Sequence, residues 1–218
     1  MEAQHQPLEA LQDIKRLMER SSRFISLSGW SGIAAGTCAL IGAWAAYSQI
    51  HAYELTRNED IHLHGDYLRG ANTNWVLVDN LVLTGAVTFL AALATAFLFT
   101  YLRSRKSGVP IWNRTVQRLT WSVLLPMSIG GLLIIRAMQW GYFELVSPGC
   151  LLFYGLGLVS AARFTLGEIR YLGYCLLVLG IINLWVPHNG LYFWAIGFGL
   201  LHILYGIAMW WKYERVPQ

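Results

Sequence analysis

The 218-residue chain is strongly apolar and weakly charged: hydrophobic residues make up 56% of it and charged residues only 13%. Soluble domains carry about 25% charged residues, so this chain has too few charges to cover a surface that faces water. The composition argues against a soluble enzyme, a disordered protein and, despite the net charge of +4, a nucleic-acid-binding protein. We therefore expect a polytopic membrane protein whose surface contacts lipids.

The N-terminal segment, residues 1–23, is polar and lacks the apolar stretch of a cleavable signal peptide. Apolar residues recur along it at helical spacing, namely Leu8, Leu11, Ile14, Leu17 and Met18. This pattern predicts a cytoplasmic amphipathic helix that lies on the inner membrane surface or folds back on the membrane-spanning part. Alternatively, the helix docks a cytoplasmic protein partner or a second copy of the chain.

Six long apolar runs follow, and each is close to the about 20 residues that a helix needs to cross a membrane. They are Phe24–Gln49, Leu81–Tyr101, Leu119–Met138, Leu145–Phe164, Ile169–Val186 and Leu191–Trp211. The runs are continuously apolar, without the alternation of a membrane barrel, so helices are expected. The sequence thus predicts an all-α fold, a six-helix transmembrane bundle over residues 24–211. An outer loop at residues 50–80, an inner basic loop at 102–118 and a tail at 212–218 complete it.

The placement of Lys and Arg predicts the orientation, because cytoplasmic segments of membrane proteins are enriched in these residues. Basic residues gather before the first run, in the second connection, near the turn after the fourth run and in the tail. The first connection is acidic instead, with Glu54, Glu59, Asp60, Asp66 and Asp79 against only Arg57 and Arg69. Both termini are therefore expected in the cytoplasm.

The first apolar run contains small residues spaced by four, among them Ser28, Gly32 and Gly36. Such rows let two membrane helices approach closely. The partner of this row is either another helix of the same bundle or the same row in a second copy, which would give a homo-oligomer. Trp30 and Trp44 lie deeper in the membrane and are expected to pack between helices.

His202 lies near the middle of the last run, about 16 Å from Leu191 at 1.5 Å per residue. An ionisable residue at that depth indicates a functional site, and the candidate ligand-binding residues are His202, Tyr205, Arg136 and Asn183. Each also has a structural alternative. His202 would be a neutral imidazole bonded to a neighbouring helix through Tyr205 or a Ser or Thr, Arg136 would reach the interface, and Asn183 would bond between helices.

A second candidate site lies on the expected outer face. His62 and His64 form an HLHG motif followed by Asp66, and His51 and His188 map to the same side. Imidazole and carboxylate groups suit a divalent transition metal. The outer loop at residues 50–80 is about thirty residues long, and structureless connections of this length are usually functional or disordered. It is therefore expected to fold over the outer mouth of the bundle. The alternative is a solvated loop that collects polar residues without binding a metal.

Three segments together resemble a known group of proteins: SSRFISLSGWSGIAAG (Ser21–Gly36), RFTLGEIRYLGYCLLVLG (Arg163–Gly180) and FWAIGFGLLHILYG (Phe193–Gly206). The chain resembles, over nearly its whole length, a family of small bacterial inner-membrane proteins without an assigned activity. The resemblance implies a multi-pass location in the bacterial cytoplasmic membrane and transfers no functional residue.

No phosphate loop, GxSxG, HExxH or retinal-type Lys within a span is found, so no enzyme active site is recognised. The favoured hypothesis is the binding or transport of a small molecule, ion or lipid. One alternative is a metal-binding membrane enzyme that uses the outer His and Asp residues. Another is an accessory or regulatory membrane subunit that docks a partner through residues 1–23.

Overall fold

The computed structural model describes residues 29–56, 75–107 and 114–213, and the regular structure in these ranges is entirely helical. The α-helices are α2 (Gly29–Thr56), α3 (Trp75–Ser107), α4 (Arg114–Gln139), α5 (Val146–Ala161), α6 (Ile169–Trp185), α7 (Gly190–Trp194) and α8 (Leu201–Tyr213). Two 3₁₀ turns, η3 (Phe143–Leu145) and η4 (Pro187–Asn189), precede α5 and α7. A π-helix, η5 (Ala195–Leu200), joins α7 to α8. The prediction of an all-α fold is confirmed for these ranges.

Five helical stretches are long and apolar enough to cross a membrane: Gly29–Tyr53, Trp75–Arg105, Arg114–Gln139, Phe143–Ala161 and Pro187–Tyr213. The remaining apolar helix, α6, has 17 residues, which is the short end of the range of about 17–25 for a spanning helix. Each stretch overlaps one of the predicted runs, as expected of a multi-pass membrane protein. The predicted helix at residues 1–23, most of the outer loop, residues 108–113 and residues 214–218 lie outside the described residues.

Large apolar side chains cover the outside of the helices. Trp44 is 71% exposed and Trp185 is 84% exposed, whereas Leu151 and Leu176 in the interior are fully buried. Water-soluble monomers rarely expose contiguous apolar surface on this scale, so the surface suits a lipid environment. The expectation that Trp44 packs between helices is wrong, because its side chain points outward.

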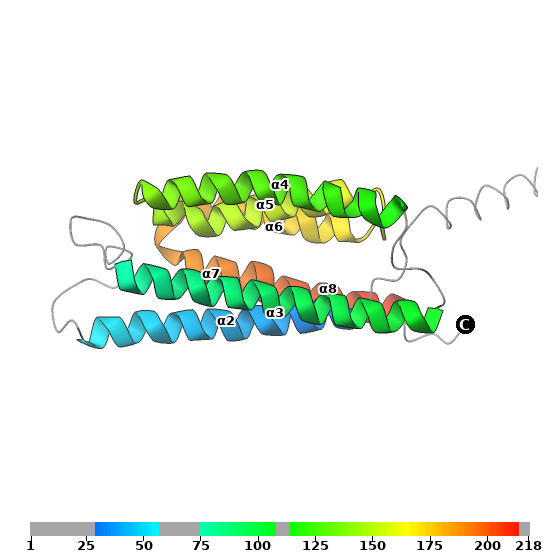
Figure 1. Ribbon diagram of the computed structural model, residues 1–218, viewed down its shortest axis with the longest axis horizontal. Helices are drawn as coiled ribbons and strands as arrows, with labels where there is room; N and C mark the ends of the chain where they lie inside the picture. Colours follow the sequence, from blue (N-terminus) through cyan, green and yellow to red (C-terminus); the bar gives the residue numbers. More distant parts are fainter. Residues whose placement is uncertain (1–28, 57–74, 108–113, 214–218) are drawn as a thin grey trace, which may run out of the picture.

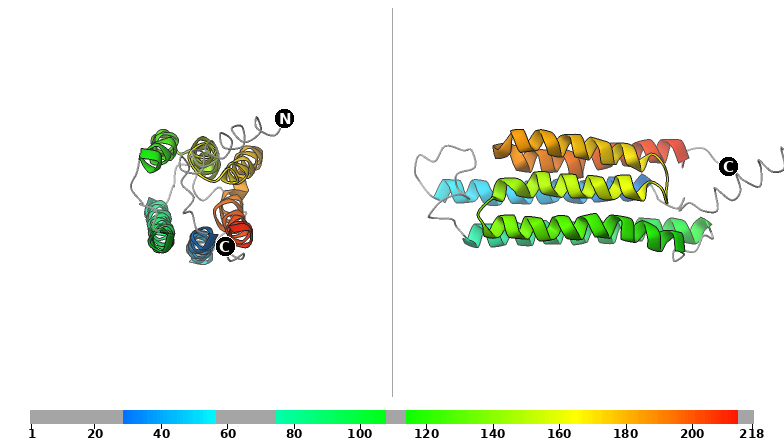
Figure 2. Two further views of the ribbon diagram at one scale, coloured as in Figure 1. Left: turned by 90° about the vertical axis from the view of Figure 1, so that its right-hand side faces the viewer. Right: turned by 90° about the horizontal axis from the view of Figure 1, so that it is seen from above.

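The helices run side by side in two groups (Figure 1). In one group α5 packs between α4 and α6, and in the other α2 packs between α3 and α8. Seen from the end, the helices form a ring in which red α8 and yellow-orange α6 are neighbours (Figure 2). The two groups meet where α7, η5 and α8 contact α5 and α6. The core cluster of Leu151, Leu158, Ile169, Leu172 and Leu176 lies on α5 and α6 at this boundary, and Phe193, Phe198, Leu201 and Tyr205 of the other group pack against it.

Glycines bring α2 and α8 together along their backbones. A Cβ atom at Gly32 would lie 3.1 Å from the Cα of Gly206, and one at Gly206 would lie 2.6 Å from the carbonyl oxygen of Gly29. A Cβ at Gly36 would likewise lie 2.6 Å from the carbonyl oxygen of Gly199. Gly32 and Gly36 of the small-residue row therefore pack against α8 and η5 of the same chain. A homo-oligomer stays a prediction.

The two ends of the bundle differ in charge. The start of α4, the ends of α3 and α8, and the turn between α5 and α6 share one end of the molecule (Figure 1). We call this the basic end, because it contains every described Lys and Arg except Arg136: Arg103, Arg105, Lys106, Arg114, Arg118, Arg163, Arg170 and Lys212. The opposite end carries Asp79 near the start of α3 and Glu144 in η3.

Candidate functional site

His202 lies on the buried face of α8, with only 7% of its surface exposed. Its Nδ1 atom lies 2.9 Å from the carbonyl oxygen of Gly197, and its Nε2 atom lies 3.2 Å from the hydroxyl of Tyr154 on α5. A carbonyl oxygen can only accept, so Nδ1 carries the hydrogen of a neutral imidazole. Nε2 is then the acceptor, and the Tyr154 hydroxyl donates to it. Both ring nitrogens are satisfied without placing a charge inside the helical bundle.

The π-helix η5 positions the carbonyl that His202 binds. A π-helical turn contains an extra residue, displaces carbonyl groups from the regular bonding pattern, and occurs frequently at functional sites. Gly197 lies within this turn, one turn before His202. A Cβ atom at Gly197 would collide with the side chain of Leu151 on α5, so glycine permits the close approach. The widened turn thus fixes the tautomer and the orientation of the imidazole.

Aromatic rings surround the imidazole. Tyr154 stacks on His202 with a centroid distance of 5.5 Å and an interplanar angle of 23°, and Phe198 stacks on it at 6.0 Å and 19°. Phe198 also contacts Tyr154 at 5.4 Å and Trp194 at 5.1 Å. We call Tyr154, Trp194, Phe198 and His202 the aromatic cluster. Apolar and aromatic walls with a few fixed polar groups are typical of small-molecule sites.

Tyr205 places a second polar group next to the aromatic cluster. Its ring packs, like that of Tyr154, against the core cluster of α5 and α6. Its hydroxyl oxygen is buried and has no hydrogen-bond partner within the described part of the chain. The sequence suggested Tyr205 as a partner for His202, whereas Tyr154 takes that role in the structure. Buried hydroxyl groups are nearly always bonded, so a water or a ligand atom is expected at Tyr205.

The other two candidate ligand-binding residues lie apart from this pair. Asn183 near the end of α6 is fully buried, and its amide nitrogen donates to the carbonyl of Val186 at 3.2 Å. Arg136 at the end of α4 is exposed, donates to Gln139 at 2.9 Å and lies over the ring of Trp140. Arg136 thus bonds within its own helix, and Asn183 bonds to the residue that directly follows its helix. Tyr205 lies three residues from His202 on α8 and is not hydrogen-bonded to it, and the contacts of Asn183 and Arg136 involve neither residue.

The predicted metal ligands that the structure describes are both exposed. His51 near the end of α2 packs edge-on against Tyr47, with ring centroids 6.0 Å apart, and His188 lies in η4. Outside the described residues lie His62, His64 and Asp66. Within the described ranges, no group of three or more His, Cys, Asp and Glu residues could hold a metal ion. The metal site stays a prediction.

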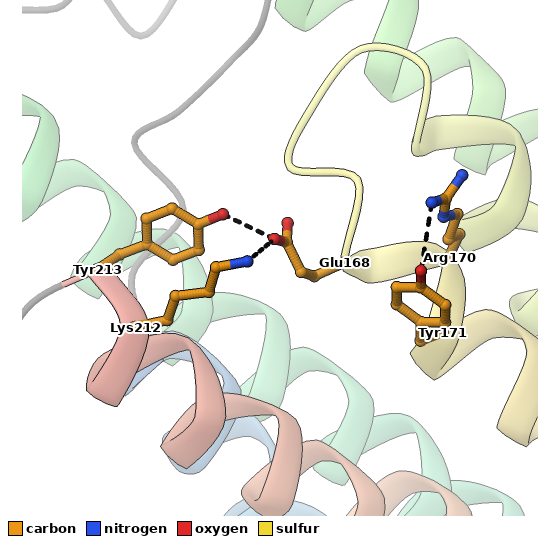
Figure 3. A network of polar contacts seen from close by, with 5 residues as sticks. All are labelled: Glu168, Arg170, Tyr171, Lys212 and Tyr213. Atoms are coloured by element: carbon orange, nitrogen blue, oxygen red, sulfur yellow. Dashed lines mark hydrogen bonds and ion pairs between the residues drawn. The ribbon is translucent and has the colours of Figure 1, made fainter.

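At the basic end, Glu168 connects the turn between α5 and α6 to the end of α8 (Figure 3). Lys212 forms an ion pair with its carboxylate, and the hydroxyl of Tyr213 donates to the same oxygen at 2.7 Å. Partial burial by itself raises the pKa of Glu168, but the hydrogen bonds from Lys212 and Tyr213 outweigh it and hold this pKa below its usual value. Arg170 bonds instead to the hydroxyl of Tyr171 (Figure 3).

Sequence reasoning missed five of the residues that build these sites: Tyr154, Trp194, Phe198, Lys212 and Tyr213. A signal for Tyr154 was present, since it is a polar residue near the middle of the fourth run, at a depth similar to that of His202. The link from Glu168 to Lys212 had no such signal, because the two residues are 44 positions apart and separated by two helices.

The chain matches no protein-family model, and no curated protein or solved structure is significantly similar to it. A role for the protein therefore has to be argued from its own residues.

Proposed function

We propose that this protein is a six-span protein of the bacterial inner membrane that binds or transports a small molecule through the aromatic cluster around His202. Five stretches meet the length of a membrane span, and α6 lies antiparallel beside α5 as the sixth. With six crossings, the start of α2 and the end of α8 share one side of the membrane. The resemblance to small bacterial inner-membrane proteins supports the location.

The basic end is proposed to face the cytoplasm. All described Lys and Arg residues except Arg136 lie there, and Lys and Arg are retained preferentially on the cytoplasmic side during insertion. Arg136 at the opposite end lies over the ring of Trp140, an arrangement suited to the membrane interface. The orientation places both termini in the cytoplasm.

The observation that carries the binding proposal is the hydrogen bond between Tyr154 and His202 inside the bundle. Ionisable residues within spans are rare and mark ligand, ion or proton sites. A ligand with an apolar, planar body and one hydrogen-bond donor fits the chemistry here. Its donor would replace the Tyr154 hydroxyl at Nε2, and its planar body would stack among Trp194 and Phe198.

Native mass spectrometry of the full chain, extracted directly into lipid nanodiscs, tests this proposal. We expect a bound non-lipid molecule on the wild-type protein whose affinity falls up to about tenfold in His202→Gln, since one hydrogen bond contributes up to about 1.5 kcal/mol and about 1.4 kcal/mol is a tenfold change. His188→Gln is the matched control, because that histidine is exposed in η4. Equal occupancy in His202→Gln, or a wild-type protein without any bound non-lipid molecule, would contradict the site.

A further inference from the structure

Positive charge is concentrated where α3 ends and α4 begins. Residues 101–118 contain no Asp or Glu and five basic residues, which we call the basic cluster: Arg103, Arg105, Lys106, Arg114 and Arg118. The side chains of Arg105, Arg114 and Arg118 are exposed. Clusters of about four to eight Lys and Arg residues beside membrane-spanning helices attract anionic lipid headgroups. The basic cluster therefore has the charge that complements a lipid phosphate.

Aromatic residues place the basic cluster at the level of the lipid headgroups. The guanidinium of Arg105 lies 5.4 Å from the ring centroid of Tyr101, one turn earlier on α3. On α4, Trp121 follows Arg118 by one turn and is 69% exposed. Tyr and Trp gather where the headgroups meet the hydrocarbon. The 33 residues of α3 also exceed the about 20 that cross the hydrocarbon, so the last turns of this helix emerge among the headgroups.

The side of α3 that faces the group of α4, α5 and α6 is apolar and uncovered. Among the described helices, α3 packs along its length on α2 and α4 packs on α5, but α3 and α4 do not pack on each other. Trp75 at the start of α3 contacts Phe143 of η3, which fixes the direction of this side. Val82 and Phe89 follow Trp75 at steps of seven residues, or nearly two turns, and are 49% and 50% exposed. A Cβ atom at Gly85, between them, would have nothing within 4 Å.

We infer that α3 and α4 bind an anionic phospholipid, whose phosphate contacts the basic cluster and whose acyl chain lies along the uncovered side of α3 at Gly85. A phospholipid fits both parts of this surface, because it joins a negative headgroup to an apolar chain. Arg side chains give phosphate oxygens charge-assisted hydrogen bonds, and the missing side chain at Gly85 leaves room for the chain. The inference goes beyond the proposed function and depends neither on the small-molecule site nor on which side of the membrane the basic end faces.

Native mass spectrometry of the full chain tests the headgroup contact. The protein is placed in bilayers of equal parts phosphatidylglycerol and phosphatidylcholine with the same acyl chains and is extracted into mild detergent, and the retained lipids are counted. We expect the wild type to retain phosphatidylglycerol in preference to phosphatidylcholine. This preference should fall at least about tenfold in the double variant Arg114→Gln, Arg118→Gln, because each basic residue near an anionic surface contributes about 1 kcal/mol and about 1.4 kcal/mol is a tenfold change.

The matched control is the double variant Arg163→Gln, Arg170→Gln. It removes the same charge from exposed positions at the same end of the molecule, in the turn between α5 and α6 and at the start of α6. This control should keep the wild-type preference for phosphatidylglycerol. Equal losses in the two double variants, or equal retention of the two lipids by the wild type, would overturn the site, because the basic end would then attract lipids without selecting one at α3 and α4.

A second pair of variants tests the acyl chain without changing any charge. Gly85→Leu fills the open space and should lower the amount of phosphatidylglycerol retained. Ala94→Leu, at an exposed position nine residues or two and a half turns away, lies on the opposite side of α3 and should retain it like the wild type. Unchanged retention in Gly85→Leu would overturn the position of the chain. A wild-type dimer that dissociates in Gly85→Leu, without retained phosphatidylglycerol, would assign this side of α3 to a second copy instead.

Discussion

The hydroxyl of Tyr154 and Nε2 of His202 are 3.2 Å apart, although the two residues are 48 positions apart in the chain. Tyr154 belongs to the group of α4, α5 and α6, and His202 belongs to the group of α2, α3 and α8. Their hydrogen bond therefore crosses the boundary between the two groups of helices. A ligand at Nε2 would therefore act on a contact between these two groups.

A double-mutant cycle with Tyr154→Phe and His202→Leu should detect this hydrogen bond. Bonds between helices in membrane proteins contribute about 0.6 kcal/mol on average and up to about 1.7 kcal/mol. We expect a coupling energy within that range, measured from unfolding of the full chain in mixed micelles. Purely additive effects of the two substitutions would show that the hydroxyl and the imidazole do not interact in the membrane.

Gly206→Ala should destabilise the close packing of α2 against α8. The added Cβ would meet backbone atoms, the carbonyl oxygen of Gly29 and the amide nitrogen of Ile33, each at 2.6 Å. Backbone cannot move aside as a side chain can, so the helices must separate, at a cost of about 1–3 kcal/mol for overpacking.

The control for that substitution is Gly131→Ala in α4, where nothing lies within 4 Å of the added Cβ. Since Ala favours helix over Gly by up to about 1 kcal/mol, this variant should unfold at the same point as the wild type or later. Unfolding in mixed micelles compares the two variants directly. If Gly206→Ala proved as stable as Gly131→Ala, close backbone packing of α2 on α8 would be refuted.

Acid should weaken the link between Glu168 and α8. The pKa of Glu168 is lower in the folded protein than its ordinary value, because hydrogen bonds from Lys212 and Tyr213 outweigh partial burial. Its stabilising effect is therefore fully present above the unfolded pKa of about 4.3 and is lost as pH falls through the lower folded pKa.

This effect is measured by thermal unfolding of the wild type and Glu168→Gln between about pH 6 and pH 3, a range that brackets the ordinary glutamate pKa of about 4.3. The wild type should lose its advantage over Glu168→Gln as pH falls, and high salt should reduce the advantage at neutral pH, because the pair is partly exposed. A constant difference across the pH range would exclude an ionised Glu168 as the source.

Cysteine labelling of intact cells tests the orientation. In a chain lacking Cys38, Cys150 and Cys175, a single cysteine at Gln139 should react with a membrane-impermeant reagent from outside. One at Arg114, at the other end of α4, should react only after permeabilisation. Because both positions belong to one helix, the reverse pattern would place the basic end outside and the termini with it.

The sequence alone determined the helical class and the approximate extent of each long apolar helix. Continuous apolar runs such as Leu119–Met138 leave helix as the structure that satisfies the backbone in lipid, and α4 indeed covers that run. The position of His202 near the middle of its apolar run was likewise readable, because rise per residue converts position in a run into distance. These properties are local, so they need no knowledge of neighbouring helices.

Only the tertiary structure decided which residues meet. In a membrane span both the lipid-facing and the helix-facing sides are apolar, so hydrophobicity does not show which side is buried, and Trp44 was misplaced for this reason. The choice of Tyr154 as the partner of His202 depends on how α5 approaches α8 and on the extra residue of the π-helix. The meeting of Glu168 with Lys212 likewise depends on helix ends brought together by packing that no local pattern encodes.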